Sequence, residues 1–249
     1  MMRRRKERDP ATALRGLALV LCIAAMVLIA GRARADEALP GLDAIALRWS
    51  EIGHLVPPDG REAAYDALLN DVDALVRAHP ERAEPLAWKG IVLAAAARAD
   101  GGLAALDRAK TARDLLLMAL HLDDHALNGA IQAALGQLYY RAPRWPLGFG
   151  DQDTALEYFR QALAIDPGNL DANYFMADYL AAHDEDHEAL IHARKALAAP
   201  PRPALDIADT ARRAETRALL SRIERRLASA APKHGHSSFW DSEVVRAFR

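Results

Sequence analysis

Apolar residues recur at spacings of three and four along the chain after residue 40, which is the pattern of helices with one buried face. Leu156, Phe159 and Leu163 fall on one face of a predicted helix over 153–165, and charged side chains occupy the opposite face. A similar stripe over 207–227 comprises Ile207, Ala211, Ala214, Ala218, Leu220, Ile223 and Leu227. No stretch alternates in the manner of a strand. The pattern therefore predicts an all-α chain of roughly nine helices joined by short loops.

One set of small and apolar residues recurs at a fixed interval. Ala155, Phe159, Ala162 and Pro167 are followed, 34 positions later, by Ala189, Ala193, Ala196 and Pro201. Leu135 and Gly136 precede the first set, and Ala177 takes the place of Gly136 before the second. Two antiparallel helices approach closely only where small residues meet, and the proline ends the second helix of each pair. This pattern resembles the tetratricopeptide repeat (TPR), a helical hairpin of about 34 residues.

The resemblance to the TPR family implies a TPR-like α-solenoid of antiparallel helical hairpins, with a right-handed superhelix and a concave binding face. It is most specific over 130–203 and extends more weakly over 60–200. Upstream, Trp88 could open a first helix, residues 64–80 fit a second helix, and a further second helix is indicated by Ala112, Leu116 and Ala119. Whether residues 40–125 follow regular TPR geometry is left open. A helix over 204–228 is predicted to cap the helical domain, which we place at 36–228.

The spacing departs from the TPR pattern between the two halves of the first unit. Fifteen residues separate Tyr139 from Ala155, where the TPR pattern has about eight. The added segment carries two prolines, two glycines and the aromatic residues Trp145 and Phe149. Nine of the chain's fifteen aromatic residues lie between Tyr139 and Tyr179. We interpret this region as an interaction surface that comprises Tyr139, Tyr140, Arg144, Trp145, Phe149, Asn173 and Tyr174. The alternative is that Trp145 and Phe149 fill the gap that the insertion creates.

The N-terminus has the pattern of a secretory signal peptide. Basic residues from Arg3 to Arg15 precede an apolar run over 17–30, and Ala33-Arg34-Ala35 follows it. This order predicts a signal peptide over 1–35, cleavage after Ala35 and a periplasmic protein. The alternative is an uncleaved anchor, although the run is shorter than the roughly 20 residues that a spanning helix needs. Cys22, the one cysteine, lies within this run after Leu21, which is too large for a typical lipoprotein signal.

Composition and charge narrow the classes of partner. Eight of the 32 basic residues and two of the 34 acidic residues lie in 1–35, which leaves a net charge of −8 for 36–249. An acidic body argues against nucleic acid, because phosphates require a basic surface. Without a cysteine, the mature chain would need no disulfide in an oxidising compartment. Contact with a membrane is expected only through an uncleaved signal segment.

Candidate catalytic and metal sites are weak. His187 and His192 are five positions apart, whereas a zinc-protease helix places its histidines four apart on one face. His183 and His187 have the right spacing but bracket a predicted turn, and His234-Gly235-His236 lies in a C-terminal tail over 229–249. No nucleophile elbow or phosphate-binding loop is present. We expect no enzymatic activity, no metal and no cofactor.

These observations predict a non-enzymatic periplasmic TPR scaffold that binds another envelope protein. Asn128 and Asn173 are the nearest candidates for the peptide-carboxylate clamp of some TPR domains, but the matching lysines are missing. The segments around Trp145 and Tyr174 also resemble, more weakly, the TatT-type periplasmic component associated with TRAP transporters. That resemblance implies the alternative of an accessory that assists a solute-binding protein or binds a small ligand. An oligomer, and docking of the 229–249 tail on the solenoid or on a partner, are left open.

Overall fold

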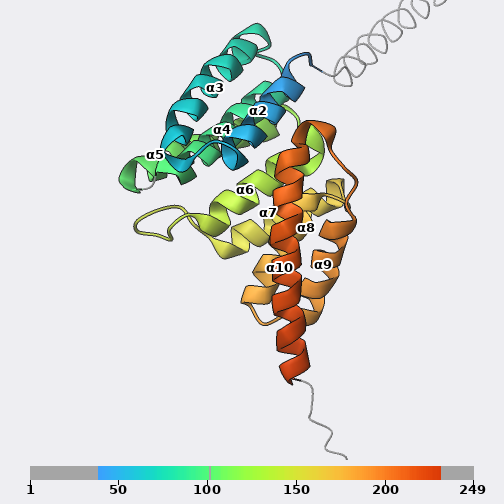
Figure 1. Cartoon of the computed structure of the whole chain (residues 1–249). Helices are drawn as coiled ribbons and strands as arrows, with labels where there is room; N and C mark the ends of the chain where they lie inside the picture. The colour runs from blue at the N-terminus through green and yellow to red at the C-terminus, as the bar shows by residue number, and fades with distance from the viewer. Residues whose placement is uncertain (1–38, 101, 231–249) are drawn as a thin grey trace, which may run out of the picture. The chain divides into compact units, whose positions relative to one another are not determined.

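Helices account for most of the chain in the computed structural model, which describes residues 39–100 and 102–230 (Figure 1). The α-helices of this part of the chain are α2 (Leu42–His54), α3 (Pro58–Ala78), α4 (Ala83–Asp100), α5 (Gly102–Leu122), α6 (Ala130–Arg141), α7 (Gln152–Ile165), α8 (Leu170–Ala182), α9 (Asp186–Ala198) and α10 (Asp206–Ala230). Two 3-10 turns precede α6 and α10: η1 (Ala126–Gly129) and η2 (Pro203–Leu205). No strand occurs in 39–100 or 102–230. The all-α prediction is confirmed.

Successive helices pack against one another as antiparallel hairpins. The pairs α4–α5, α8–α9, α6–α7 and α3–α4 make the most extensive of these contacts, and α10 packs on α9 and α8. These hairpins form a TPR-like α-solenoid closed by a long C-terminal helix, as the sequence predicts. The proposed signal segment and the tail beyond Ala230 lie outside the described residues.

The residues of the repeat pattern lie where two helices meet. Ala155, Phe159 and Ala162 of α7 are fully buried. A Cβ atom on Gly136 of α6 would lie against the Phe159 ring and 3.1 Å from the carbonyl oxygen of Ala155, so only glycine permits this approach. In the second unit Ala177, Ala189, Ala193 and Ala196 are likewise fully buried, whereas Pro167 and Pro201 follow the second helix of each unit at exposed positions.

The hairpin α4–α5 uses the same close approach with longer helices. A Cβ atom on Gly90 would lie 2.7 Å from Cγ of Leu116 and 3.0 Å from the carbonyl oxygen of Ala112, both on α5. These helices have 18 and 21 residues, against 12 and 14 in α6 and α7. Trp88 does not open the first helix, because α4 begins at Ala83 and Trp88 lies buried within it. Residues 83–122 are thus a TPR-like hairpin with extended helices.

Helix α10 joins the last hairpin to the first described helix. Leu219 and Ile223 of α10 enter the apolar core of α7, α8 and α9. At its other end α10 packs on α2, where the buried Oγ of Ser50 accepts a hydrogen bond of 2.7 Å from the backbone N–H of Ala208. In Figure 1 the orange and red ribbon of α10 runs past α8 and α9.

The buried face of α10 differs from the predicted stripe. Ala214 and Ala218 are exposed, and Thr216 and Leu219 are buried in their place. Alanine side chains add little apolar area, so the larger Leu219 and Ile223 set the rotation of the helix. None of the helices in 39–100 and 102–230 is long and apolar enough to cross a membrane.

Candidate functional site

The insertion between α6 and α7 forms an ordered loop over residues 142–151. Backbone hydrogen bonds close it: the N–H of Gly150 donates to Pro143 at 2.8 Å, and the N–H of Asp151 donates to Tyr139 at 3.0 Å. A Cβ atom on Gly150 would lie 2.9 Å from the carbonyl oxygen of Pro143, so the two arms of the loop approach more closely than a side chain permits. Asp151 then caps α7 by accepting a hydrogen bond of 2.7 Å from the N–H of Thr154.

Phe149 anchors this loop to the helices beside it. Its ring meets Tyr139 of α6 edge to face, with ring centroids 5.4 Å apart. The guanidinium of Arg113 on α5 lies 4.6 Å from the centre of the Phe149 ring. Tyr139 in turn stacks on Tyr158 of α7. The expectation that an aromatic residue fills the gap therefore fits Phe149.

Trp145 and Leu147 form the tip of the loop and point away from the core. Their exposed fractions are 86% for Trp145 and 75% for Leu147, the largest among the exposed large apolar residues of the described chain. The expectation that Trp145 fills the gap is wrong, because Phe149 and Tyr139 already occupy that space. Arg144, which directly precedes Trp145, is also exposed. We call Arg144, Trp145 and Leu147 the loop tip.

The remaining residues of the predicted surface lie elsewhere. Tyr140 follows Tyr139 on α6 but turns toward α7 and α8, because consecutive residues of a helix point about 100° apart; its ring lies 5.9 Å from that of Tyr179. Tyr174 on α8 is covered by the guanidinium of Arg212 from α10, 4.5 Å from its ring centre. The two tyrosines are half-buried, and their ring contacts are made with residues of α6, α7, α8 and α10.

Asn173 does not belong to any surface. It is fully buried, and its side-chain amide donates hydrogen bonds to the carbonyl oxygens of Pro167 at 3.0 Å and Asn169 at 2.9 Å. Its Oδ1 lies 3.0 Å from Nδ1 of His192 on α9. Asn173 thus holds the start of α8 and orients His192. The sequence alone does not distinguish a buried asparagine such as Asn173 from an exposed one.

A network of charges fixes α10 to α8 near Tyr174. Asp171 of α8 lies 2.9 Å from both Arg202 and Arg212. Arg202 also pairs with Asp209, whose side chain is only 4% exposed. Burial alone would raise the pKa of Asp171, but the two guanidinium groups outweigh it and hold this pKa below its ordinary value. Arg202 and Arg212 therefore have a structural role, because their guanidinium groups pair with Asp171 and Asp209.

Two histidine features of the sequence have structural roles. Nδ1 of His183 lies 2.7 Å from the carbonyl oxygen of Tyr179, and its ring stacks on that of Tyr179. The ring of His192 lies within hydrogen-bonding distance of Asn173. Burial is the main cause that lowers the pKa of His192, and the positive charge of Lys195 lowers it further.

Asp123, Asp124 and His125 bring possible ligand atoms within 4.8 Å of one another. They bond one another in the exposed turn before η1, which accounts for their placement.

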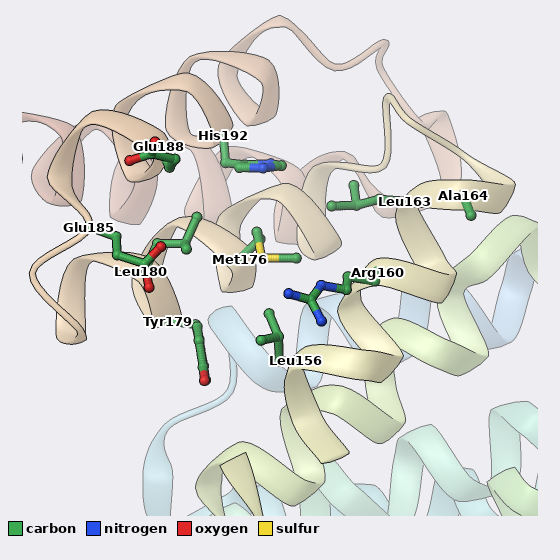
Figure 2. Close-up of a pocket in the computed structure, with 10 residues that line it drawn as sticks. All are labelled: Leu156, Arg160, Leu163, Ala164, Met176, Tyr179, Leu180, Glu185, Glu188 and His192. Atoms are coloured by element: carbon green, nitrogen blue, oxygen red, sulfur yellow. The ribbon is translucent and has the colours of Figure 1, made fainter. Parts of the chain in front are cut away.

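A pocket opens between α7 and α9, with α8 beneath it (Figure 2). Its volume is about 480 Å³, and its apolar surface comes from Leu156, Leu163, Met176 and Leu180. Arg160 and Ala164 extend the α7 wall, while Glu185, Glu188 and His192 form the opposite wall and Tyr179 closes one end. The repeat pattern gave no sign of this pocket, because most of its lining residues are not among the repeat's packing positions.

Comparison with known proteins adds little to this picture. No family model and no curated protein matches the chain. The crystal structure of MamA is 15% identical with a TM-score of 0.40, covering 69% of this chain and 95% of that one. The MamA RS-1 ArsTM double mutant is 16% identical with a TM-score of 0.39, covering 77% of this chain and 99% of that one. Values this low assign neither a family nor a function, and the solenoid fold stands on the chain's own helix packing.

Proposed function

We propose that this chain is an exported, non-enzymatic TPR-like scaffold that binds another envelope protein through the loop tip. The observation that carries this proposal is the exposure of Trp145 and Leu147 on a loop whose backbone is closed by hydrogen bonds. Large apolar side chains exposed together on a surface usually mark an interaction site. Tryptophan and arginine, both present here, supply much of the binding energy in protein interfaces.

The anchoring of the loop favours this role over a mobile hydrophobic flap. Phe149 is held between Tyr139 and Arg113, so the tip is presented from a fixed base. A preformed tip loses less conformational entropy on binding than a flexible one would. The signal pattern of residues 1–35 supports the envelope as the compartment, and this part of the proposal rests on sequence.

The test is capture from a periplasmic extract with residues 36–249 as bait. The double variant Trp145→Ala/Leu147→Ala removes the two apolar side chains of the loop tip, and Leu55→Ala/Ile191→Ala removes two apolar side chains that are exposed elsewhere. We expect the wild type and the Leu55/Ile191 variant to retain the same partner, and the tip variant to lose about tenfold or more of its affinity in a binding assay with the purified partner. Equal affinity of the tip variant would contradict the proposal.

The captured protein also separates the scaffold from its alternative. A TatT-like accessory of a TRAP transporter would retain a solute-binding protein, whereas a general scaffold would retain an envelope protein of another class.

Mass spectrometry of the exported chain tests the compartment, because cleavage after Ala35 leaves Asp36 as the first residue. Light scattering of the same material gives the oligomeric state.

A further inference from the structure

The last helix of the solenoid ends beside the pocket between α7 and α9. The guanidinium of Arg226 on α10 donates a hydrogen bond of 2.8 Å to the carbonyl oxygen of Ala181 and pairs with the carboxylate of Asp186. Each of these two partners directly follows a residue that lines the pocket. Helix α10 ends at Ala230, one turn or about 6 Å of helix rise beyond Arg226. The chain therefore leaves α10 close to one end of the pocket.

A polar linker and an apolar segment follow α10 in the sequence. The linker, 231–238, contains no large apolar residue. In the segment 239–249, Trp240, Val244 and Phe248 recur at intervals of four, with charged residues at positions between them. This is the spacing of apolar residues on one face of an amphipathic helix. The three side chains could therefore lie together on a single apolar surface.

The linker is long enough to reach the pocket and short enough to favour it. Its eight residues span at most about 26–29 Å, and the contacts of Arg226 lie next to the pocket's lining. A segment attached by a short linker has an effective concentration of about 1 mM at a site within its reach. Even weak apolar contacts are therefore sufficient to hold the segment 239–249 in the pocket.

The pocket provides the surface that such an apolar face requires. Leu156 of α7 and Met176 and Leu180 of α8 form its apolar floor, and Figure 2 shows their side chains between the two walls. Its volume of about 480 Å³ lies within the range of about 300–1,000 Å³ that takes ligands larger than an indole ring. The loop tip, by contrast, projects from the surface and cannot enclose a ring. Three charged residues of the pocket walls are exposed and can stay in water while the floor is covered: Arg160, Glu185 and Glu188.

We propose that the segment 239–249 folds back and fills the α7–α9 pocket of its own chain. Trp240, which is nearest the linker, lies against Met176 and Leu180, and Val244 and Phe248 cover the rest of the floor. The chain thereby carries an internal occupant that any other ligand of the pocket must displace. This inference does not depend on the proposed scaffold function, because the loop tip contributes no residue to the pocket or to the segment.

Methyl NMR of the whole chain tests this contact, with Met176 as the reporter and the exposed Met118 on α5 as the control. In the wild type we expect NOEs between the Met176 methyl group and the Trp240 ring. Trp240→Ala/Phe248→Ala should abolish these NOEs and shift the Met176 resonance, and it should leave Met118 unchanged. Val245→Ala removes an apolar side chain that lies off the predicted face and should leave both resonances unchanged. A Met176 resonance that is the same in the double variant and the wild type would overturn the proposal.

A peptide of residues 231–249 distinguishes docking within one chain from docking between copies. Added to the Trp240→Ala/Phe248→Ala chain, the peptide should restore the wild-type Met176 resonance with a Kd of about 1 mM or lower. The wild type should require about tenfold more peptide for any effect, because its own segment competes. Failure of the peptide to restore the resonance at several times this concentration would contradict the proposal. A wild-type Met176 shift that depends on protein concentration would place the segment in a second copy and overturn the assignment to its own chain.

Discussion

Asp171 is the residue on which the seating of α10 depends most directly. It accepts hydrogen bonds from Arg202 and Arg212, which come from the segments before and within α10. Because its pKa is lower in the folded chain than in the unfolded chain, its ionised form stabilises the fold. That contribution is complete above the unfolded pKa of about 4 and is lost as the pH falls through the folded value.

The residue-scale prediction is a pH-dependent effect of Asp171→Asn. At pH 7 the variant should unfold at a lower urea concentration than the wild type, because asparagine cannot form the two ion pairs. The difference should shrink as the pH falls below about 4, because Asp171 then takes up a proton in the unfolded chain, and it should vanish once the pH is below the lower pKa of the folded chain. Urea unfolding at pH 7 and pH 3 measures it. Asp71→Asn, at an exposed site on α3, provides the control, and an Asp171 effect of the same size at both pH values would contradict the assignment.

Single positions differ in how far the sequence predicts them. Gly136 and Ala177 could be identified as close-approach positions because the repeat supplies a second copy for comparison. Asn173 could not be assigned to the interior, since its burial depends on carbonyl groups of Pro167 and Asn169 that only the folded turn brings near. Gly90 carries the same steric signal as Gly136, but the longer α4 and α5 shift its partners out of the expected spacing.

At the scale of elements, the two aromatic residues of the loop over 142–151 have different surroundings. Phe149 packs on Tyr139 and Arg113, whereas Trp145 is exposed. The sequence predicts the insertion and its aromatic content but not this division, because both residues sit among similar prolines and glycines. The contacts with Tyr139 of α6 and Arg113 of α5, both of which lie outside the loop's own sequence, hold the Phe149 ring inward.

The element-scale prediction compares Phe149→Ala with Trp145→Ala/Leu147→Ala. We expect Phe149→Ala to lower the free energy of unfolding by about 1–3 kcal/mol, because it removes a packed aromatic ring. The double change at the tip should alter it by less than about 0.5 kcal/mol, as is usual for exposed sites. Thermal unfolding followed by circular dichroism measures both. If the tip variant were the more destabilised, the tip would be part of the core.

At the scale of the whole described chain, the first and last helices are directly connected. Ser50 of α2 is fully buried and satisfies the N–H of Ala208, one of the backbone donors that the start of α10 would otherwise leave unpaired. Sequence reasoning predicts α10 as a cap on the preceding hairpin, because repeat patterns report neighbours. The hydrogen bond between residues 158 positions apart has no signal in the repeat.

At this scale we predict that Ser50→Ala lowers the free energy of unfolding of the whole helical solenoid. Loss of this buried hydrogen bond should cost about 1–3 kcal/mol. Urea unfolding followed by circular dichroism and by tryptophan fluorescence should show one shared transition in the wild type and a lower midpoint by both probes in the variant. Ser229→Ala, at an exposed position near the end of α10, should leave the midpoint unchanged. A Ser50→Ala midpoint equal to that of the wild type would show that α2 and α10 are held by apolar contacts alone.

The contact between α2 and α10 also restricts how such a chain can evolve. Repeat proteins commonly lengthen when a unit is duplicated, since each unit touches only its neighbours. Here an additional hairpin anywhere between α2 and α10 would carry Ser50 away from Ala208 and uncover Leu205, which packs among the side chains of α2, α3 and α4. A new copy of the unit would therefore break this contact, whereas longer helices and an insertion such as the loop over 142–151 leave it in place.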